Sequence, residues 1–398
     1  MIVSSQRMSL KTPFVSETMT KKMGEMEEKI QKHLAFLQRK KGSSLLFGCI
    51  DGWENLSRYS SDTTAFFPSG VVDIKDITCE RFKEMYCSYA ATPGNPDALL
   101  RTLEPLPFFP WVEAAMGCTI QYTGMNFWSR PMVDHFTLQE LEEYADAIQC
   151  GDKWPNHVCL NMTRHSVLAT YETCIDYLHE RFSPSHPIGQ TILRGPLDVA
   201  AAVLGDENLI YQFFERPVLV KKILAVAADL FLSFIAAQKR RMPAYANGYV
   251  IGTYYIWTPG TNIRLQEDAM SLLSPELYRE FVYPLDCRIA AAADYTLFHL
   301  HASALHLLEI LLETKNIRIF QISKDEGIEL QSILAKLQMI QKAGNCLLLK
   351  GRFTLREAQL AVENLHPEGL CIQAVVLDDH EKDEIYTYFN QIESRRMT

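Results

Sequence analysis

The sequence lacks the short motifs that identify several common classes of protein. None of its ten cysteines forms a C-x-x-C pair, which excludes the usual zinc-finger and thioredoxin-type sites. No G-x-G-x-x-G follows the first expected strand, and no G-x-x-x-x-G-K-[ST] occurs, so nucleotide-binding sheets lose support. No G-x-S-x-G marks a serine nucleophile either. Any chemistry must therefore come from other residues.

Basic charge and long apolar runs are scarce as well. Lys and Arg number 39 against 48 Asp and Glu, for a net charge of -9, and no basic stripe is present to neutralise nucleic-acid phosphates. The longest apolar stretch, Ile223 to Gln238, contains Asp229 and is short for crossing a bilayer. Met1 to Lys22 is polar, without the apolar core of a signal peptide. We expect a cytoplasmic protein with reduced thiols that binds neither nucleic acid nor membrane.

The hydrophobic pattern predicts an α/β fold. Residues 18–41 carry apolar side chains at helical spacing and end at Gly42, which indicates an N-terminal helical extension over residues 1–42. Residues 44–50 form a short apolar run typical of a buried parallel strand. Further strands, alternating with helical patterns, are expected at 188–193, 249–257, 295–300, 317–322, 346–349 and 371–376. The alternation predicts a parallel sheet, either open or closed into a barrel.

Aromatic residues are concentrated between Pro93 and Pro131, a proline-rich stretch that we interpret as a long loop. Long structured loops often line binding sites, so we assign Trp111 and Trp128 to a substrate pocket. Packing in the hydrophobic core is the alternative role for both. Three residues in expected strands are assigned to the same pocket, with core packing again as the alternative, namely Tyr254, Trp257 and Gln321.

The sharpest local signal is the sequence Phe298-His299-Leu300-His301 at the end of an expected strand. Side chains alternate along a strand, so the two histidines share one face and lie about 6–7 Å apart. Two imidazoles at this spacing can bind one metal ion, and catalytic zinc usually takes a third protein ligand and keeps an open position. A hydrogen bond from either histidine to a neighbouring loop is the alternative.

Carboxylates follow several of the expected strands and are candidates for a third ligand or a general acid or base. In a barrel enzyme the catalytic groups lie at this end of the strands. Helix capping and solvated loop charge are the alternatives for each. The candidates are Asp51, Glu267, Asp268, Asp325, Glu326, Asp378 and Asp379.

Several segments in the second half resemble one known superfamily. They are Gly195-Pro196-Leu197, Glu215-Arg216-Pro217, Leu273 to Tyr278 with Phe281 and Pro284, Phe298 to Ala302, and Asp325. Over residues 185–380 the chain resembles the uroporphyrinogen decarboxylase-like superfamily. The resemblance implies a (β/α)8 TIM barrel over residues 43–398, with the aromatic-rich segment as a loop insertion. The superfamily contains cofactor-free decarboxylases and zinc-binding methyltransferases that work with corrinoid proteins.

Three places in the sequence distinguish these branches. The decarboxylases carry an arginine-rich segment after the first strand and a histidine after the last, whereas residues 50–58 here hold one arginine and two acids, and residues 375–379 hold no histidine. The methyltransferases bind zinc through a His-x-Cys pair and a later cysteine. Here the pair is His299-x-His301, and Asp378 is the nearest stand-in for the cysteine.

The resemblance therefore favours an enzyme that moves a methyl group from a small O- or N-methylated compound to a corrinoid protein. Zinc held by His299 and His301 is expected to act as a Lewis acid, helped by Asp378 or Glu267. Two alternatives stay open. One is a metal-free decarboxylase acting on a smaller acid, and the other is a catalytically silent barrel that binds a ligand or a corrinoid partner.

Overall fold

The structure is a computed structural model that describes residues 17–51, 70–91, 99–107, 109–124, 126–149 and 164–397. Most of the polar N-terminal segment and nearly all of the arginine-poor segment at 50–58 lie outside the described residues. Phe108 of the aromatic-rich stretch does so too.

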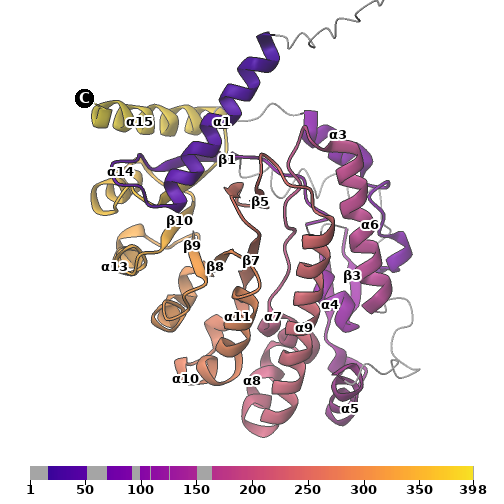
Figure 1. Cartoon of the computed structure of the whole chain (residues 1–398). Helices are drawn as coiled ribbons and strands as arrows, with labels where there is room; N and C mark the ends of the chain where they lie inside the picture. Colours follow the sequence, from indigo (N-terminus) through magenta and orange to yellow (C-terminus); the bar gives the residue numbers. More distant parts are fainter. Residues whose placement is uncertain are drawn as a thin grey trace, which may run out of the picture.

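A parallel sheet of six strands forms the centre of the molecule (Figure 1). Its strands lie in the order β1-β11-β10-β9-β8-β7, and every neighbouring pair is parallel. β8 and β10 are almost continuously buried, as expected for strands covered on both faces. The bounds are β1 Leu46–Asp51, β7 Asn262–Gln266, β8 Tyr295–His301, β9 Ile317–Lys324, β10 Cys346–Gly351 and β11 Leu370–Val376.

Two extended segments, around residues 99–107 and 187–193, pair with each other, and the second contacts β7. They meet at a parallel bridge between Leu103 and Ile188. Beyond this bridge, the side chain of Gln190 makes the hydrogen bonds to β7 that a strand backbone would otherwise make. Its Nε2 donates to the carbonyl of Arg264, and its Oε1 accepts from the backbone amide of Arg264. The expected parallel α/β fold is confirmed, whereas closure into an eight-stranded barrel stays a prediction.

Helices pack around the strands (Figure 1). The N-terminal helix that the sequence predicts is present as α1, which contacts β6 and β1. The helices of the fold are α1 Glu17–Leu37, α3 Lys83–Ala91, α4 Trp111–Met116, α5 Leu138–Gln149, α6 Arg164–Phe182, α7 Pro196–Leu204, α8 Asp206–Glu215, α9 Pro217–Arg241, α10 Pro275–Leu277, α11 Tyr283–Ala290, α12 Leu308–Leu311, α13 Leu330–Lys342, α14 Leu355–Asn364 and α15 Asp379–Met397. No described helix is both long and apolar enough to span a membrane.

Two expectations about local structure are wrong. The aromatic-rich stretch is not one loop, because it contains α4 and the strands β3 (Thr119–Tyr122) and β4 (Phe127–Arg130), which form a small antiparallel sheet with β2 (Gly70–Val71). The single strand expected at 249–257 is a hairpin of β5 (Tyr249–Ile251) and β6 (Ile256–Thr258). The chain reverses between them with positive φ angles of 66° at Thr253 and 56° at Tyr255, which apolar periodicity does not reveal.

Candidate metal centre

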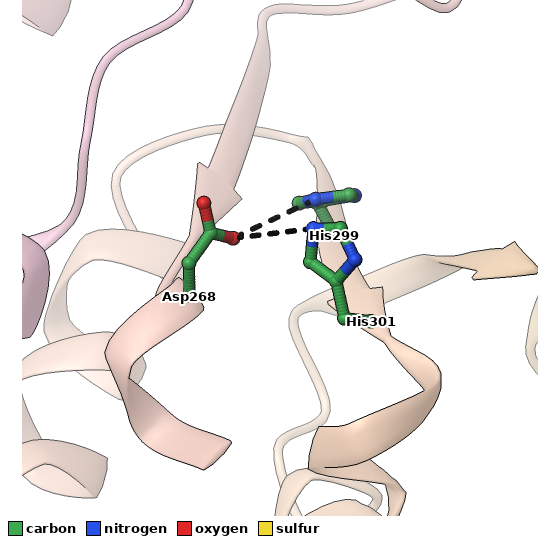
Figure 2. A group of neighbouring side chains, drawn as sticks. All are labelled: Asp268, His299 and His301. Atoms are coloured by element: carbon green, nitrogen blue, oxygen red, sulfur yellow. Dashed lines mark ion pairs between the residues drawn. The ribbon is translucent and has the colours of Figure 1, made fainter. Parts of the chain in front are cut away.

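His299 and His301 lie at the carboxyl end of β8, on the same face of the strand. β7 pairs with β8 so that Gln266 lies beside His299, which brings the residues after β7 to the two imidazoles. Asp268, two residues beyond Gln266, points its carboxylate toward both rings (Figure 2). Its Oδ1 lies 3.6 Å from Nε2 of His299 and 3.8 Å from Nε2 of His301. These three side chains form the candidate triad, whose ligand atoms all lie within 4.8 Å of one another.

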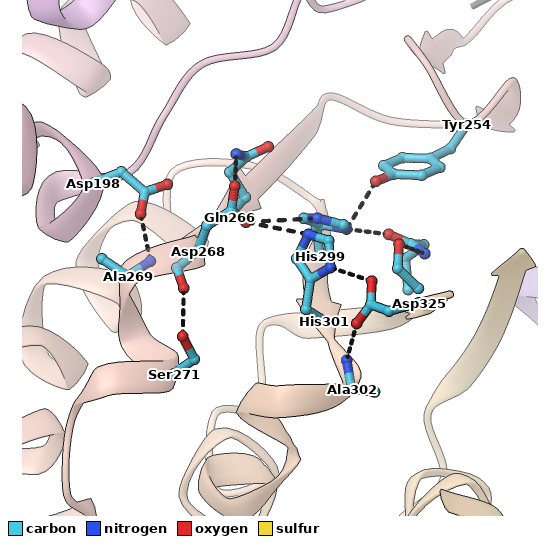
Figure 3. A network of polar contacts seen from close by, with 12 residues as sticks. Asp198, Tyr254, Gln266, Asp268, Ala269, Ser271, His299, His301, Ala302 and Asp325 are labelled. Carbon is cyan, nitrogen blue, oxygen red and sulfur yellow. Dashed lines mark hydrogen bonds and ion pairs between the residues drawn. The ribbon is translucent and has the colours of Figure 1, made fainter. Parts of the chain in front are cut away.

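Each histidine of the triad is held through its other ring nitrogen (Figure 3). Nδ1 of His299 lies 2.9 Å from the hydroxyl of Tyr254 and also contacts Oε1 of Gln321. Nδ1 of His301 lies 2.6 Å from Oδ1 of Asp325. Both Nε2 atoms therefore remain directed at Asp268. Such outer contacts orient imidazole ligands in metal sites.

The aspartate of the triad is oriented in the same way. Nε2 of Gln266 donates to Oδ2 of Asp268 at 2.9 Å, which leaves Oδ1 facing the histidines. Only 8% of the His299 side chain is exposed, against 40% for His301 and 47% for Asp268. Burial, reinforced by nearby Arg264, lowers the pKa of His299 well below its usual value and keeps the imidazole neutral, the form that binds metal. The triad is thus anchored on one side and open on the other.

Buried charges lie behind the triad, around Tyr254. The guanidinium of Arg264 and the ammonium of Lys350 each lie 5.2 Å from the centre of the Tyr254 ring. Glu104 accepts from the amide and hydroxyl of Thr253 and supplies a countercharge. Burial raises the pKa of Glu104 to about 7 and lowers that of Lys350 to about 8. Tyr254, the partner of His299, therefore lies close to two basic side chains.

A cavity of about 300 Å³ opens beside the triad and shares Asp268 with it. Its walls combine aromatic and proline side chains with a few polar groups. It is lined by Pro107, Phe109, Pro110, Glu113, Asn126, Phe127, Trp128, Ile192, Arg194, Gln266 and Asp268. We call this space the substrate-side pocket. Trp128 lines this pocket and is 57% exposed, and its expected role in substrate binding stays a prediction.

The other residues expected in the site lie elsewhere. Glu267 is buried, and its Oε2 accepts hydrogen bonds from the amides of Leu197 and Asp198 at the start of α7. Burial and the nearby carboxyl of Asp286 raise the pKa of Glu267 well above its usual value. Asp378 is exposed and accepts from the amide of Glu381, in the first turn of α15.

Two tryptophans assigned to the pocket are packed in the protein interior. Trp111 is completely buried, stacks edge-on against Tyr171 and donates to the carbonyl of Pro105. Trp257 belongs to a small core cluster with Ile30 of α1 and donates to the carbonyl of Tyr245. The alternative of core packing therefore describes both positions.

Sequence reasoning missed the specific partners of the two histidines. Asp268 was one of a list of carboxylates and was not singled out, and Gln266 was not considered. Strand parity is the signal that could have found them, because Arg264, Gln266 and Asp268 are separated by two residues each and share the face that holds His299. That signal requires β7 to be recognised as a strand.

Comparisons with known proteins bear on the fold. No family model matches the chain, and no curated protein matches it. Among solved structures, a methyltransferase from Methanosarcina mazei is similar over 91% of this chain and 98% of its own, with a TM-score of 0.56 and 14% identity. At this identity the likeness concerns the fold.

Proposed function

We propose that the protein is a methyltransferase-like enzyme whose active centre is a divalent metal ion, with zinc the best candidate, held by Asp268, His299 and His301. The observation that carries the proposal is the convergence of three ligand atoms that are each oriented by a separate neighbour. Two histidines and one carboxylate make a known ligand set for a catalytic metal with open positions. The similarity to a methyltransferase structure supports the choice of reaction.

A metal ion held by Asp268, His299 and His301 would supply a Lewis acid for the heteroatom carrying the methyl group. The residues of the chain have complementary roles. Tyr254, Gln321 and Asp325 fix the orientation of the imidazoles, and Gln266 fixes the carboxylate of Asp268. The half-exposed faces of His301 and Asp268 leave room for a substrate on the side of the substrate-side pocket.

We propose a small O- or N-methylated compound as methyl donor and a corrinoid protein as acceptor. The heteroatom that loses the methyl group would keep the electron pair of the broken bond and take a proton from water, and the corrinoid acceptor would supply the electron pair of the new bond to the methyl carbon. Asp378 and Glu267 have no part in this proposal, because each caps a helix.

Metal content of the purified protein tests the proposed centre. We expect about one equivalent of zinc per chain, lost in Asp268→Ala, His299→Ala and His301→Ala. His306→Ala is the matched control, because His306 is an exposed histidine whose ring contacts the carbonyls of Ser303 and Leu273 instead of the triad. If the wild-type protein contains no metal and takes up no added zinc, the proposed metal centre is rejected. The remaining candidates are then a metal-free decarboxylase and a catalytically silent barrel.

Methyl transfer is tested separately with free cob(I)alamin as acceptor and a panel of methyl ethers and methylamines as donors. Formation of methylcobalamin is followed by absorbance. We expect turnover with at least one donor, and a loss of at least 100-fold in His299→Ala at unchanged circular dichroism. A metal-loaded protein that transfers no methyl group from any donor would keep the centre but reject this reaction.

A further inference from the structure

Arg194 is the single Lys or Arg among the residues that line the substrate-side pocket. It follows the extended segment 187–193 and directly precedes the turn into α7. Its side chain is 43% exposed, and its Nη1 lies 3.4 Å from Oε1 of Glu113. Arg194 donates no hydrogen bond to any residue that the structure describes, so its guanidinium retains donors that can face the cavity.

Glu113 explains how this arginine is kept at the pocket. Only 1% of the Glu113 side chain is exposed, and neither carboxylate oxygen accepts a hydrogen bond from the described residues. A buried carboxylate without a partner is costly, so the attraction to Arg194 holds the guanidinium over the pocket. A guanidinium presents several donors in one plane, and one edge can pair with Glu113 while another binds a second carboxylate.

Aromatic side chains also line the pocket. Phe127 and Trp128 are consecutive residues of β4, so their side chains leave opposite faces of the strand, and Phe109 stacks edge-on against Phe127 with ring centres 5.5 Å apart. A volume of about 300 Å³ is at the lower limit for ligand pockets, so the occupant is small. A small ligand whose apolar part packs against these aromatic side chains would place its charged group near Arg194 and another part of the molecule near Asp268.

The charges of the pocket also favour an anion once the triad holds a metal. Its lining carries two carboxylates, Glu113 and Asp268, and one cation, Arg194. Glu113 is balanced by Arg194, and a divalent ion would more than balance Asp268. A positively charged ligand would then meet both the metal and the guanidinium at short range.

We propose that the substrate-side pocket binds a small organic anion whose carboxylate pairs with Arg194 and whose apolar body packs against the aromatic lining of the pocket. The inference rests on the proposed function only in taking the triad as the place of reaction. It narrows the methyl donor to a compound with a carboxylate at one end and the methylated heteroatom at the other. Glu113 is a positioning residue for Arg194.

Titration calorimetry on the full chain with benzoate and its neutral counterpart benzamide tests this proposal. We expect benzoate to bind at least 10-fold more tightly than benzamide, and Arg194→Gln to abolish that preference. Arg240→Gln is the matched control, because Arg240 forms an exposed ion pair with Glu172 on the outer helices. The double variant Glu113→Gln/Arg194→Gln removes both charges and should behave like Arg194→Gln without leaving a buried carboxylate unpaired.

His299→Ala separates this pocket from the metal centre. We expect this variant to lose the metal and to keep a reduced preference for benzoate, because Asp268 then adds an unbalanced negative charge to the pocket while Arg194 remains. A preference that persists in Arg194→Gln, a preference that disappears only in His299→Ala, or equal binding of the two probes by the wild-type protein would each overturn the proposal. If methyl transfer fails while the preference depends on Arg194, the proposed reaction falls and the anion pocket stands.

Discussion

Nδ1 of His301 lies 2.6 Å from one oxygen of Asp325, and the other oxygen of that carboxylate accepts a hydrogen bond from the amide of Ala302. Asp325 is therefore fixed from two directions and fixes the ring in turn. We expect Asp325→Ala to weaken zinc binding about 10- to 100-fold, the usual effect of removing such an outer partner. Competition with a chromogenic chelator measures the affinity.

Asp378→Ala is the control for this prediction, because Asp378 is also a carboxylate that follows a strand but only caps α15. Its zinc affinity should equal that of the wild-type protein. A loss of affinity in Asp378→Ala, with no change in Asp325→Ala, would mean that Asp378 is the ligand that the resemblance first suggested.

Glu267 and Asp268 are neighbours in the sequence with opposite roles, and a pair of alanine variants distinguishes them. Asp268→Ala should remove the metal and leave stability nearly unchanged, because the side chain is half-exposed. Glu267→Ala should lower the free energy of unfolding by about 1–3 kcal/mol, because two amides at the start of α7 lose their acceptor. Urea denaturation and metal analysis of both variants check the two effects, and exchanged outcomes would refute the assignment.

The sequence predicts correctly those features that depend only on the periodicity of a strand or on the residues at a helix start. The alternation in Phe298-His299-Leu300-His301 placed both histidines on one face, and the structure agrees. A helix also begins at Ser274-Pro275 in the usual way, with the serine hydroxyl accepting from the amide of Leu277 and a proline in the first turn. Local rules decide both features, so no tertiary information was needed.

The third member of the triad depends on tertiary structure and could not be found in the same way. β7 has only five residues, and although Asn262 to Gln266 alternate polar and apolar side chains, the register of this strand against β8 is set by packing of the whole sheet. Without that register, Glu267 and Asp268 are equivalent acids. The close approach of Glu267 to Gly195, where an added Cβ would lie 2.3 Å from its Oε1, is likewise a contact between distant parts of the chain.

Two tryptophans illustrate the same division and yield a further prediction. Trp111→Ala should cost about 3–5 kcal/mol of stability, because the ring is fully buried among Phe109, Tyr171 and Phe234. Trp128→Ala should leave stability within about 0.5 kcal/mol, since the ring is largely exposed, and should weaken benzoate and benzamide binding together. Urea denaturation and calorimetry measure the two quantities. Equal destabilisation by both substitutions would contradict these placements.

Glu104 makes the free energy of unfolding depend on pH. Burial raises its pKa from 4.5 to about 7, against the opposing effects of the Thr253 amide, Arg264 and Lys350. The folded state therefore holds a proton between these two values that the unfolded state has released. Stability from this group is fully present below pH 4.5 and is lost as the pH rises through about 7, by about 3 kcal/mol in total.

Glu104→Gln removes this proton uptake while keeping an acceptor for Thr253. Between pH 5 and pH 7.5 the wild-type protein should lose stability that the variant keeps. We therefore expect the free energy of unfolding of the variant, minus that of the wild-type protein, to increase by about 2–3 kcal/mol over this range. Urea denaturation at both pH values measures the difference. Glu280→Gln, an exposed ion-pair partner of Lys221, controls for the loss of one carboxylate and should show the wild-type pH dependence. Parallel pH profiles for Glu104→Gln and the wild-type protein would show that Glu104 is ionised across the whole range, with Arg264 and Lys350 compensating its burial in full.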